Sequence, residues 1–307
     1  MLSPTLFLLH INDMLDTSNI HCYADDSTGD AVYTGHAGLS REIVEQCREK
    51  LVSTFESSLE KVAKWGKLNL VQFNPRRLKF AISPLFDNTS LKASPSIGIL
   101  GLEILSDCQF RGHQEGKVKL ASKKLGVIRA RQYFKPAHIL ALYKAQVRPH
   151  MEYCCHLWSG APQYQLDPFD HVQRRAARIV GHSVLCERLD HVALCRDVAS
   201  VCAFYRIYHG ECSEELFNLI PAAEFYLRTT RLMLGYHPHQ LDVWRSSTVR
   251  FSRSFLPRTT KLWNEHPCAV FPGRYGMGTF KKSAYTFLKG RQRSCDSSGV
   301  TRECGRR

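Results

Sequence analysis

The sequence lacks the long apolar runs of a membrane protein. No stretch reaches the roughly 18 consecutive apolar residues that a membrane-spanning helix needs. The apolar run from Leu6 to Ile11 is short and no basic segment precedes it, so we expect no signal peptide. No internal repeat is visible either. The sequence therefore predicts an intracellular protein of the nucleus, the cytoplasm or both, with no membrane partner.

The twelve cysteines lack the spacing of a zinc site. No Cys-x-x-Cys pair occurs, and the run Cys186, Cys195, Cys202 and Cys212 fits no standard ligand pattern. Cys47 and Cys202 fall where a helix would bury an apolar side chain. We therefore expect reduced, mostly buried thiols.

Positive charge is in excess but unevenly spread. The 307 residues carry a formal net charge of +14, and 44% of them are hydrophobic, enough for the cores of two domains. Residues 1–110 hold 10 basic and 13 acidic side chains, residues 111–185 hold 13 and 4, and residues 186–307 hold 19 and 11. This pattern suits a metal site beside a surface that binds a polyanion. A generally basic protein is the alternative interpretation.

Two adjacent carboxylates, Asp25 and Asp26, separate two β-prone runs. The first runs from Ile20 to Tyr23 and the second from Ala31 to Tyr33, which predicts a β-hairpin with both carboxylates at its turn. Two like charges at one point repel unless a cation lies between them, and oxygen ligands suit Mg²⁺. A hydrated Mg²⁺ held in this way is typical of phosphoryl and nucleotidyl transfer. Asp is also a common turn residue, so a plain turn is the competing interpretation.

Helical periodicity is clearest between about Ser40 and Trp65, which we expect to pack against the sheet that carries the acidic pair. Its apolar stripe consists of Val44, Cys47, Leu51, Phe55, Leu59 and Val62. A short helix is predicted over Leu2 to Leu15. Strands are predicted over Leu68–Phe73, Leu78–Ser83 and Gly98–Leu105.

Three basic helices are predicted downstream, over Lys117–Tyr133, Ala137–Arg148 (ended by Pro149) and about Asp167–Val180. The basic side chains expected to face solvent are Lys117, Lys123, Lys124, Arg129, Arg131, Arg174, Arg175 and Arg178. Leu189–His209 predicts one or two further helices.

Regular periodicity fades after Pro221. There, arginines alternate with aromatic residues: Arg228, Arg231, Arg245, Arg250, Arg253 and Arg258 with Tyr226, Tyr236, Trp244, Phe251 and Phe255. Such a mixture suits stacking on single-stranded RNA, and equally a loosely packed basic domain with aromatic anchors. His237 and His239 with Asp242 fit an ordinary surface loop better than a metal site.

The Tyr-Ala-Asp-Asp sequence from Tyr23 to Asp26 resembles the catalytic motif of reverse transcriptases. Leu2–Asp13 resembles the tail of the preceding polymerase motif. Trp65–Leu70 with Phe73–Pro75 resembles the next motif. The segments that resemble the primer grip, the thumb and the following region of jockey-like non-LTR retrotransposon polymerases are Ile99–Ile104, Leu142–Ala145, Pro149–Cys154, Arg174–Ala176, Phe255–Arg258 and Leu262–Asn264. The resemblance covers most of the chain in the order of the family.

The resemblance implies an α+β fold made of parts of a polymerase. Residues 1–111 would form a partial palm, an antiparallel sheet with helices, and residues 112–185 a helical thumb. Residues 186–291 would form a basic, mostly helical or irregular C-terminal region, and residues 292–307 a disordered tail. The basic helix faces would then hold a template–primer duplex by its phosphates, whereas solvated faces without a ligand are the alternative.

The implied activity is RNA-directed DNA synthesis by two-metal nucleotidyl transfer, with an RNA template, a DNA primer and deoxynucleoside triphosphates as partners. Asp25 would be the catalytic residue that binds Mg²⁺ directly, and Asp26 a weaker ligand or a support.

Four further residues acquire roles from the resemblance. Tyr23 and Arg77 would lie near the triphosphate, and Leu100 and Gly101 would belong to the primer grip. The family has a lysine where this chain has Arg77, and arginine cannot give up a proton as lysine can. A solvent-exposed strand edge is therefore an equal interpretation for Arg77.

The resemblance also implies missing parts. The fingers and the first catalytic aspartate motif would lie upstream of Met1, so we expect the 307 residues alone not to polymerise. A non-catalytic nucleic-acid-binding protein that retains the basic thumb is the alternative, and a degenerate fragment without function is a third possibility.

Overall fold

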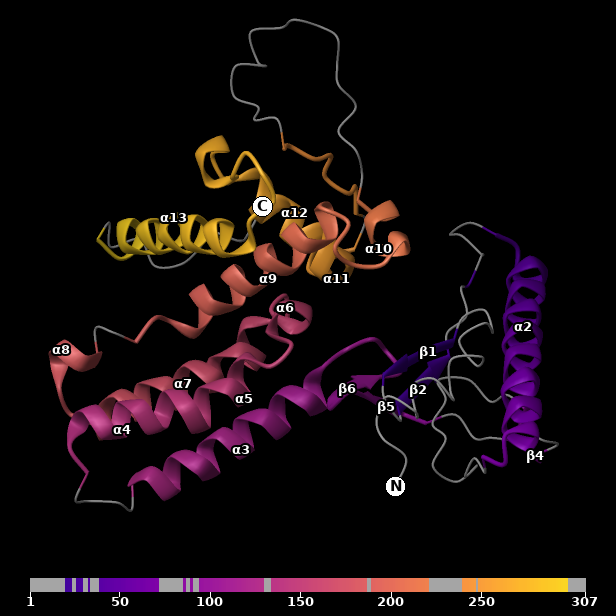
Figure 1. The fold of residues 1–307 in the computed structure, drawn as a ribbon, viewed down its shortest axis with the longest axis horizontal. Helices are drawn as coiled ribbons and strands as arrows, with labels where there is room; N and C mark the ends of the chain where they lie inside the picture. Colours follow the sequence, from indigo (N-terminus) through magenta and orange to yellow (C-terminus); the bar gives the residue numbers. More distant parts are fainter. Residues whose placement is uncertain are drawn as a thin grey trace, which may run out of the picture. The chain divides into compact units, whose positions relative to one another are not determined.

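The computed structural model describes residues 20–23, 26–29, 33, 39–71, 85–86, 89–90, 94–129, 134–186, 189–220, 239–246 and 248–297. The chain divides into two compact units between His113 and Gln114. Its class is α+β, mostly helical with short antiparallel pairs of strands (Figure 1). The helix predicted over Leu2–Leu15 and the strand predicted over Leu78–Ser83 lie outside the described residues.

The strands of the first unit form antiparallel hairpins. β1 (Ile20–Tyr23) pairs with β2 (Asp26–Gly29), which confirms a hairpin whose first strand is Ile20–Tyr23. The second strand begins at Asp26 and not at Ala31 as predicted, so Asp26 is a paired strand residue and not a turn residue. β3 (Leu85–Phe86) pairs with β4 (Thr89–Ser90), and β5 (Ser96–Ile99) pairs with β6 (Leu102–Leu105). The single strand predicted over Gly98–Leu105 is therefore wrong, because the chain reverses direction between β5 and β6.

Helix α2 (Arg41–Leu68) confirms the predicted amphipathic helix. Ser40 caps its N-terminus by accepting a hydrogen bond from the backbone N–H of Ile43 at 3.4 Å. In the second half of the apolar stripe Phe55, Leu59 and Val62 are buried. In the first half Val44, Cys47 and Leu51 are half-buried.

Helix α2 ends later than predicted, so residues 68–71 are not a strand. The backbone N–H of Asn69 donates to the carbonyl of Trp65 at 2.9 Å, and that of Val71 donates to Gly66 at 2.9 Å. Leu70 between them has a left-handed φ of 57°. This pattern is a Schellman-type ending, which satisfies the last carbonyls of the helix and overrides the β-prone composition.

The second unit is helical. After α3 (Arg111–Arg129), which begins before the boundary, come α4 (Pro136–Leu142), the π-helical segment η2 (Tyr143–Val147), α5 (Arg148–Glu152), α6 (Cys155–Trp158), α7 (Gln163–Val180) and α8 (Ser183–Cys186). Then follow α9 (Val192–Tyr208), α10 (Glu214–Asn218), α11 (Val249–Ser252), α12 (Phe255–Asn264), η4 (Cys268–Val270) and α13 (Met277–Ser297). Among the described residues, none of the helices combines the length with the hydropathy that crossing a bilayer requires.

Pro149 does not end its helix, in contrast to the prediction. The chain runs from α4 through η2 into α5, and Pro149 occupies the first turn of α5. A proline has no N–H to donate, and its ring crowds the carbonyl four residues earlier. The wider π turn just before it relieves that crowding and keeps Tyr143 and Val147 fully buried.

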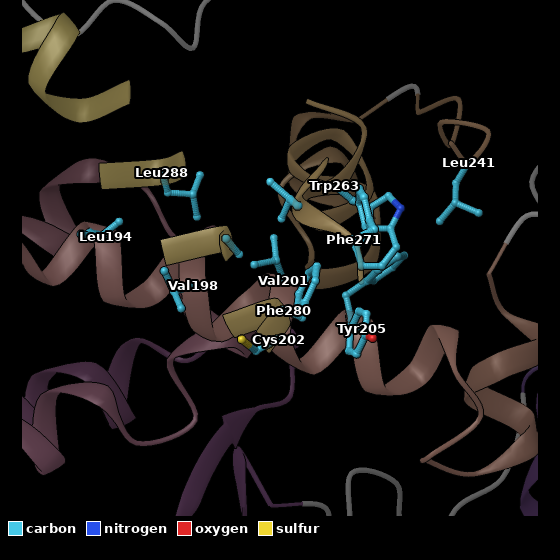
Figure 2. Close-up of a cluster of buried hydrophobic side chains, with 13 residues drawn as sticks. Leu194, Val198, Val201, Cys202, Tyr205, Leu241, Trp263, Phe271, Phe280 and Leu288 are labelled. Carbon is cyan, nitrogen blue, oxygen red and sulfur yellow. The ribbon is translucent and has the colours of Figure 1, made fainter. Parts of the chain in front are cut away.

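Helix α9 is the centre of the second unit. It contacts α5, α6 and α7 and also α10, α12 and α13. Figure 2 shows its apolar side chains, among them Val201 and Tyr205, packed with Trp263, Phe271 and Phe280. The predicted thumb and C-terminal region are therefore joined in one compact unit.

The final helix corrects the predicted tail. Helix α13 continues to Ser297, so residues 292–297 are helical where disorder was predicted. The helix buries Phe280, Ala284 and Leu288 against α9, at spacings of four residues. Residues 298–307 lie outside the described residues.

Gly160 provides a test of this packing. A Cβ atom added at Gly160 would lie 1.8 Å from the backbone oxygen of Arg253, so the segment between α11 and α12 would have to move. We expect Gly160→Ala to lower the free energy of unfolding by about 2 kcal/mol, as overpacking against backbone does. Urea unfolding followed by far-ultraviolet circular dichroism measures the change.

The matched control is Gly116→Ala. Gly116 is an exposed residue inside α3, and an added Cβ would meet nothing within 4 Å. Alanine there should raise the free energy of unfolding by about 0.5–1 kcal/mol, because glycine is a poor helix former. Equal effects of the two substitutions would contradict the observed contact.

Candidate nucleic-acid interface

The acidic pair lies at a tight hairpin. The register pairs Tyr23 with Asp26 and leaves two residues, Ala24 and Asp25, between the strand ends. Asp26 is the first residue of β2. Asp25 and Arg77 lie outside the described residues, and Tyr23 and Asp26 are described through their backbone. The register is that of a hairpin with two residues between its strands, and it makes Asp26 a paired strand residue.

Helix α2 supports this hairpin, as predicted. Ile20 of β1 is buried in one cluster with Val62, and Trp65 packs against them. A Cβ added at Gly29 of β2 would lie 3.2 Å from atoms of both Ile20 and Phe55. The hairpin backbone therefore approaches α2 closely, and the apolar stripe of α2 packs on β1 and β2.

The candidate primer grip is the turn between β5 and β6. Ile99 pairs with Leu102, and the two residues between them have left-handed φ angles, 46° at Leu100 and 75° at Gly101. Both angles fit a type I′ turn, which glycine accepts freely and leucine does not. Leu100 is nevertheless an exposed apolar side chain at the tip of the turn. An unfavourable residue at an exposed tip is typical of a contact position.

The β5–β6 hairpin is anchored to the start of α3. The backbone N–H of Glu103 lies 3.4 Å from Nδ1 of His113, to which it donates. A Cβ added at Gly112 would lie 2.8 Å from a carboxylate oxygen of Glu103. The glycine therefore lets the first turn of α3 approach β6.

The predicted basic residues of α3 divide between two environments. Lys123 and Arg129 are exposed, as predicted, whereas Lys117 and Lys124 are half-buried. Ala121, Leu125 and Ile128 form the buried stripe. Arg131 lies outside the described residues.

Lys117 and Lys124 converge on His150 of α5. They are seven residues apart, so they lie on the same face of α3. The Nζ atom of Lys117 lies 4.9 Å from the ring centre of Tyr153. Partial burial lowers the pKa of His150, and the positive charges of Lys124 and Lys117 lower it further. His150 is not among the predicted site residues, although it lies in the segment Pro149–Cys154 that resembles the family.

Arg148 holds α5, and with it His150, against the core. It pairs with Glu152 and donates to the carbonyl of Asp190 at 3.2 Å. Burial alone would lower the pKa of Arg148, but the hydrogen bond and the charge of Glu152 raise it above its ordinary value. Asp190 in turn accepts hydrogen bonds from Tyr285 and Lys289, each at 2.7 Å. The position of His150 therefore depends on contacts that reach α13.

Helix α7 presents a second basic surface. Arg174, Arg175 and Arg178 are all exposed, as predicted, while Phe169, Val172 and Ala176 are buried on the opposite side. Within the described part of the chain, none of these three arginines forms an ion pair. Their charges are therefore available to a ligand.

The arginine–aromatic region after Pro221 is partly structural. Arg258 donates to the carbonyl of His156 at 3.2 Å and to the hydroxyl of Ser200 at 2.8 Å. Phe255 packs against the core around α9. The side chains of Arg258 and Phe255 are thus occupied by contacts within the fold, whereas the side chain of Phe251 is exposed. Tyr226, Tyr236, Arg228, Arg231 and His237 lie outside the described residues.

Within the described segments, neither the cysteines nor any group of possible metal ligands forms a further candidate site. Cys155 and Cys202 are buried, and burial raises their pKa values to about 12 and about 11. Groups of three or more His, Cys, Asp or Glu side chains that could hold a metal ion do not occur there. This statement does not cover Asp25, which lies outside the described residues.

The pKa of His150 provides a test of the basic cluster. Replacing Lys124 by glutamine removes a positive charge that lowers the pKa of His150, so we expect Lys124→Gln to raise that pKa. A pH titration of the histidine ring signals by NMR measures it. Lys123→Gln, on the exposed side of α3, is the control and should leave that pKa unchanged.

Comparison of the chain with models of known families, with curated proteins and with solved structures finds no match.

Proposed function

We propose that this chain comprises palm and thumb portions of a non-LTR retrotransposon reverse transcriptase, and that α3 and α7 hold a template–primer duplex by its phosphates. The proposal that the chain binds a duplex rests on three arginines of α7 that are exposed and form no ion pair with other described residues. The catalytic half is supported by the Tyr-Ala-Asp-Asp motif at a tight hairpin, followed by the other family-like segments in order.

The charges on α7 favour a polyanion over a simple solvated face. Arg174, Arg175 and Arg178 follow one another within two turns. Neighbouring like charges repel when no acid neutralises them. Phosphates would relieve that repulsion and release their own condensed counterions, which is the main source of affinity for nucleic acids.

The surface of α3 favours a duplex over a single strand. Its exposed face carries Gly116, Leu120 and Val127 in one strip. Lysines lie on both sides of the strip: Lys117 and Lys124 on the side of His150, and Lys119 and Lys123 on the other. An uncharged strip between two rows of cations matches a groove between two phosphate backbones.

The hairpin supplies the catalytic half of the proposal. Asp25 and Asp26 would hold Mg²⁺ through carboxylate oxygens, the donor type that this ion prefers. When bound, the metal would neutralise negative charge on the transferring phosphate. The chain's own contribution would be the β1–β2 hairpin, in which Asp26 is the first residue of β2 and which packs on α2 through Ile20 and Gly29.

Salt-dependent binding tests the role of α7. We expect the triple variant Arg174→Gln, Arg175→Gln, Arg178→Gln to bind a short RNA–DNA duplex more weakly than the parent chain. The slope of log K against log salt should become less steep by up to about 2.7, or about 0.9 for each phosphate that an arginine no longer neutralises. Fluorescence anisotropy over a salt series measures both quantities.

The matched control removes three exposed lysines of α2, by Lys50→Gln, Lys61→Gln and Lys64→Gln. It changes the net charge by the same amount, so equal weakening in the two triple variants would show a general charge effect and contradict the proposed surface.

Primer extension separates binding from catalysis. We expect the 307 residues to bind an RNA template annealed to a DNA primer but not to extend it with Mg²⁺ and deoxynucleoside triphosphates, because one catalytic aspartate motif alone cannot position both metals. Replacing Asp25 and Asp26 by alanine should leave duplex affinity unchanged. Incorporation that disappears in Asp25→Ala would show instead that these residues contain a working active site.

A further inference from the structure

The end of α9 forms a pocket that the proposed function does not use. It has a volume of about 520 Å³ and is lined by Tyr208, His209, Gly210, Cys212, Glu214 and Phe217. This volume lies within the usual range of ligand sites. We propose that the pocket binds the side chain of a lysine or arginine from a partner polypeptide.

The local sequence shapes the pocket through the ending of α9. Gly210 has a left-handed φ of 71°, and the backbone N–H of Glu211 donates to the carbonyl of Arg206 at 2.9 Å. This Schellman-type ending turns the chain back, so that α10 contacts α9. Tyr208 therefore lies across the pocket from residues of α10.

The walls of the pocket are aromatic. Tyr208 and His209 have ring centres 5.2 Å apart, and Tyr275 lies edge-on to His209 at 5.3 Å. Phe217 adds an exposed ring from α10. The faces of Tyr and Phe rings attract ammonium and guanidinium groups.

The acidic residues around the pocket favour a cationic ligand over a nucleic acid. Residues 207–220 contain Glu211, Glu214 and Glu215 but no lysine or arginine, in a chain whose net charge is +14. Burial and the nearby His239 lower the pKa of His209, against the opposing charge of Glu211, which favours the uncharged ring. Arg206 lies one turn back along α9 and is exposed. Glu214 lines the pocket itself, and its carboxylate would repel phosphate groups, so we do not expect this site to bind the duplex.

An apolar margin beside the pocket favours a polypeptide over a small cation. Leu216 and Phe217 of α10 and Leu219, just after the helix, are all exposed. A lysine or arginine side chain with apolar neighbours in its own sequence would cover them, because its alkyl stem also packs on apolar surface.

NMR titration of the full chain tests the proposal. The probes are N-acetyl-lysine-methylamide and N-acetyl-arginine-methylamide, with the neutral N-acetyl-norleucine-methylamide as their control. We expect the two cationic probes to shift the backbone amide signals of Gly210 and Cys212 in a saturable way, and the neutral probe to leave them unchanged.

Two substitutions of exposed side chains should weaken this binding without unfolding the chain. Phe217→Ala removes a ring face and Glu214→Gln removes the charge, and each should raise the dissociation constant about two- to fivefold. The matched controls are Phe251→Ala on α11 and Glu60→Gln on α2, both of which replace exposed residues and should have no effect.

Three results would overturn the proposal. The first is the absence of shifts at Gly210 with either cationic probe, and the second is equal weakening in the control variants. The third is a shift of the same amides by single-stranded oligothymidylate in place of the cations, which would identify a base-stacking site. Failure of duplex binding would leave the proposal intact, because the two surfaces share no residue.

Discussion

The second unit depends on the burial of α9 on nearly all its sides. A helix that is apolar all round must be covered from several directions, and α9 is covered by α5, α6 and α7 as well as by α12 and α13. Trp263 is fully buried in this packing and donates to the carbonyl of His239 at 2.7 Å. Helix α7, which carries the three exposed arginines of the proposed duplex surface, therefore packs on the same helix as the C-terminal helices α12 and α13.

The arginines of this unit have two different physical roles. Arg148 and Arg258 are largely buried, and each is neutralised by an acid and by carbonyl oxygens. A buried cation without such partners would be strongly destabilising, so these residues are committed to the fold. Arg174, Arg175 and Arg178 are exposed and unpaired among the described residues, and they retain their full charge for a ligand. Net charge alone cannot separate the two groups.

Hydrophobic periodicity and β propensity predict the structure well where the conformation of a segment depends mainly on its own residues. The period of Phe55, Leu59 and Val62 predicted a helix that buries these residues, and the β-prone run from Ile20 to Tyr23 predicted a hairpin strand. Predictions failed where neighbours decide the outcome. Pro149 normally ends a helix, yet a π turn accommodates it because Tyr143 and Val147 must stay buried. Residues 292–297 have little local signal and are helical as the end of a helix that packs on α9.

Three features could be predicted from residue type and short-range spacing alone: the strand Ile20–Tyr23, the amphipathic helix that packs on it, and the excess of basic residues after residue 110. The second strand of the hairpin, which begins at Asp26, could not. Only the tertiary structure decided which cations are available, that His150 lies beside Lys117 and Lys124, and that Glu214 and Phe217 share a pocket with Tyr208. The physical reason is that a charge is neutralised, or a pKa shifted, by groups close in space. Arg258 and Ser200 are far apart in the chain, and their contact cannot be read from any local pattern.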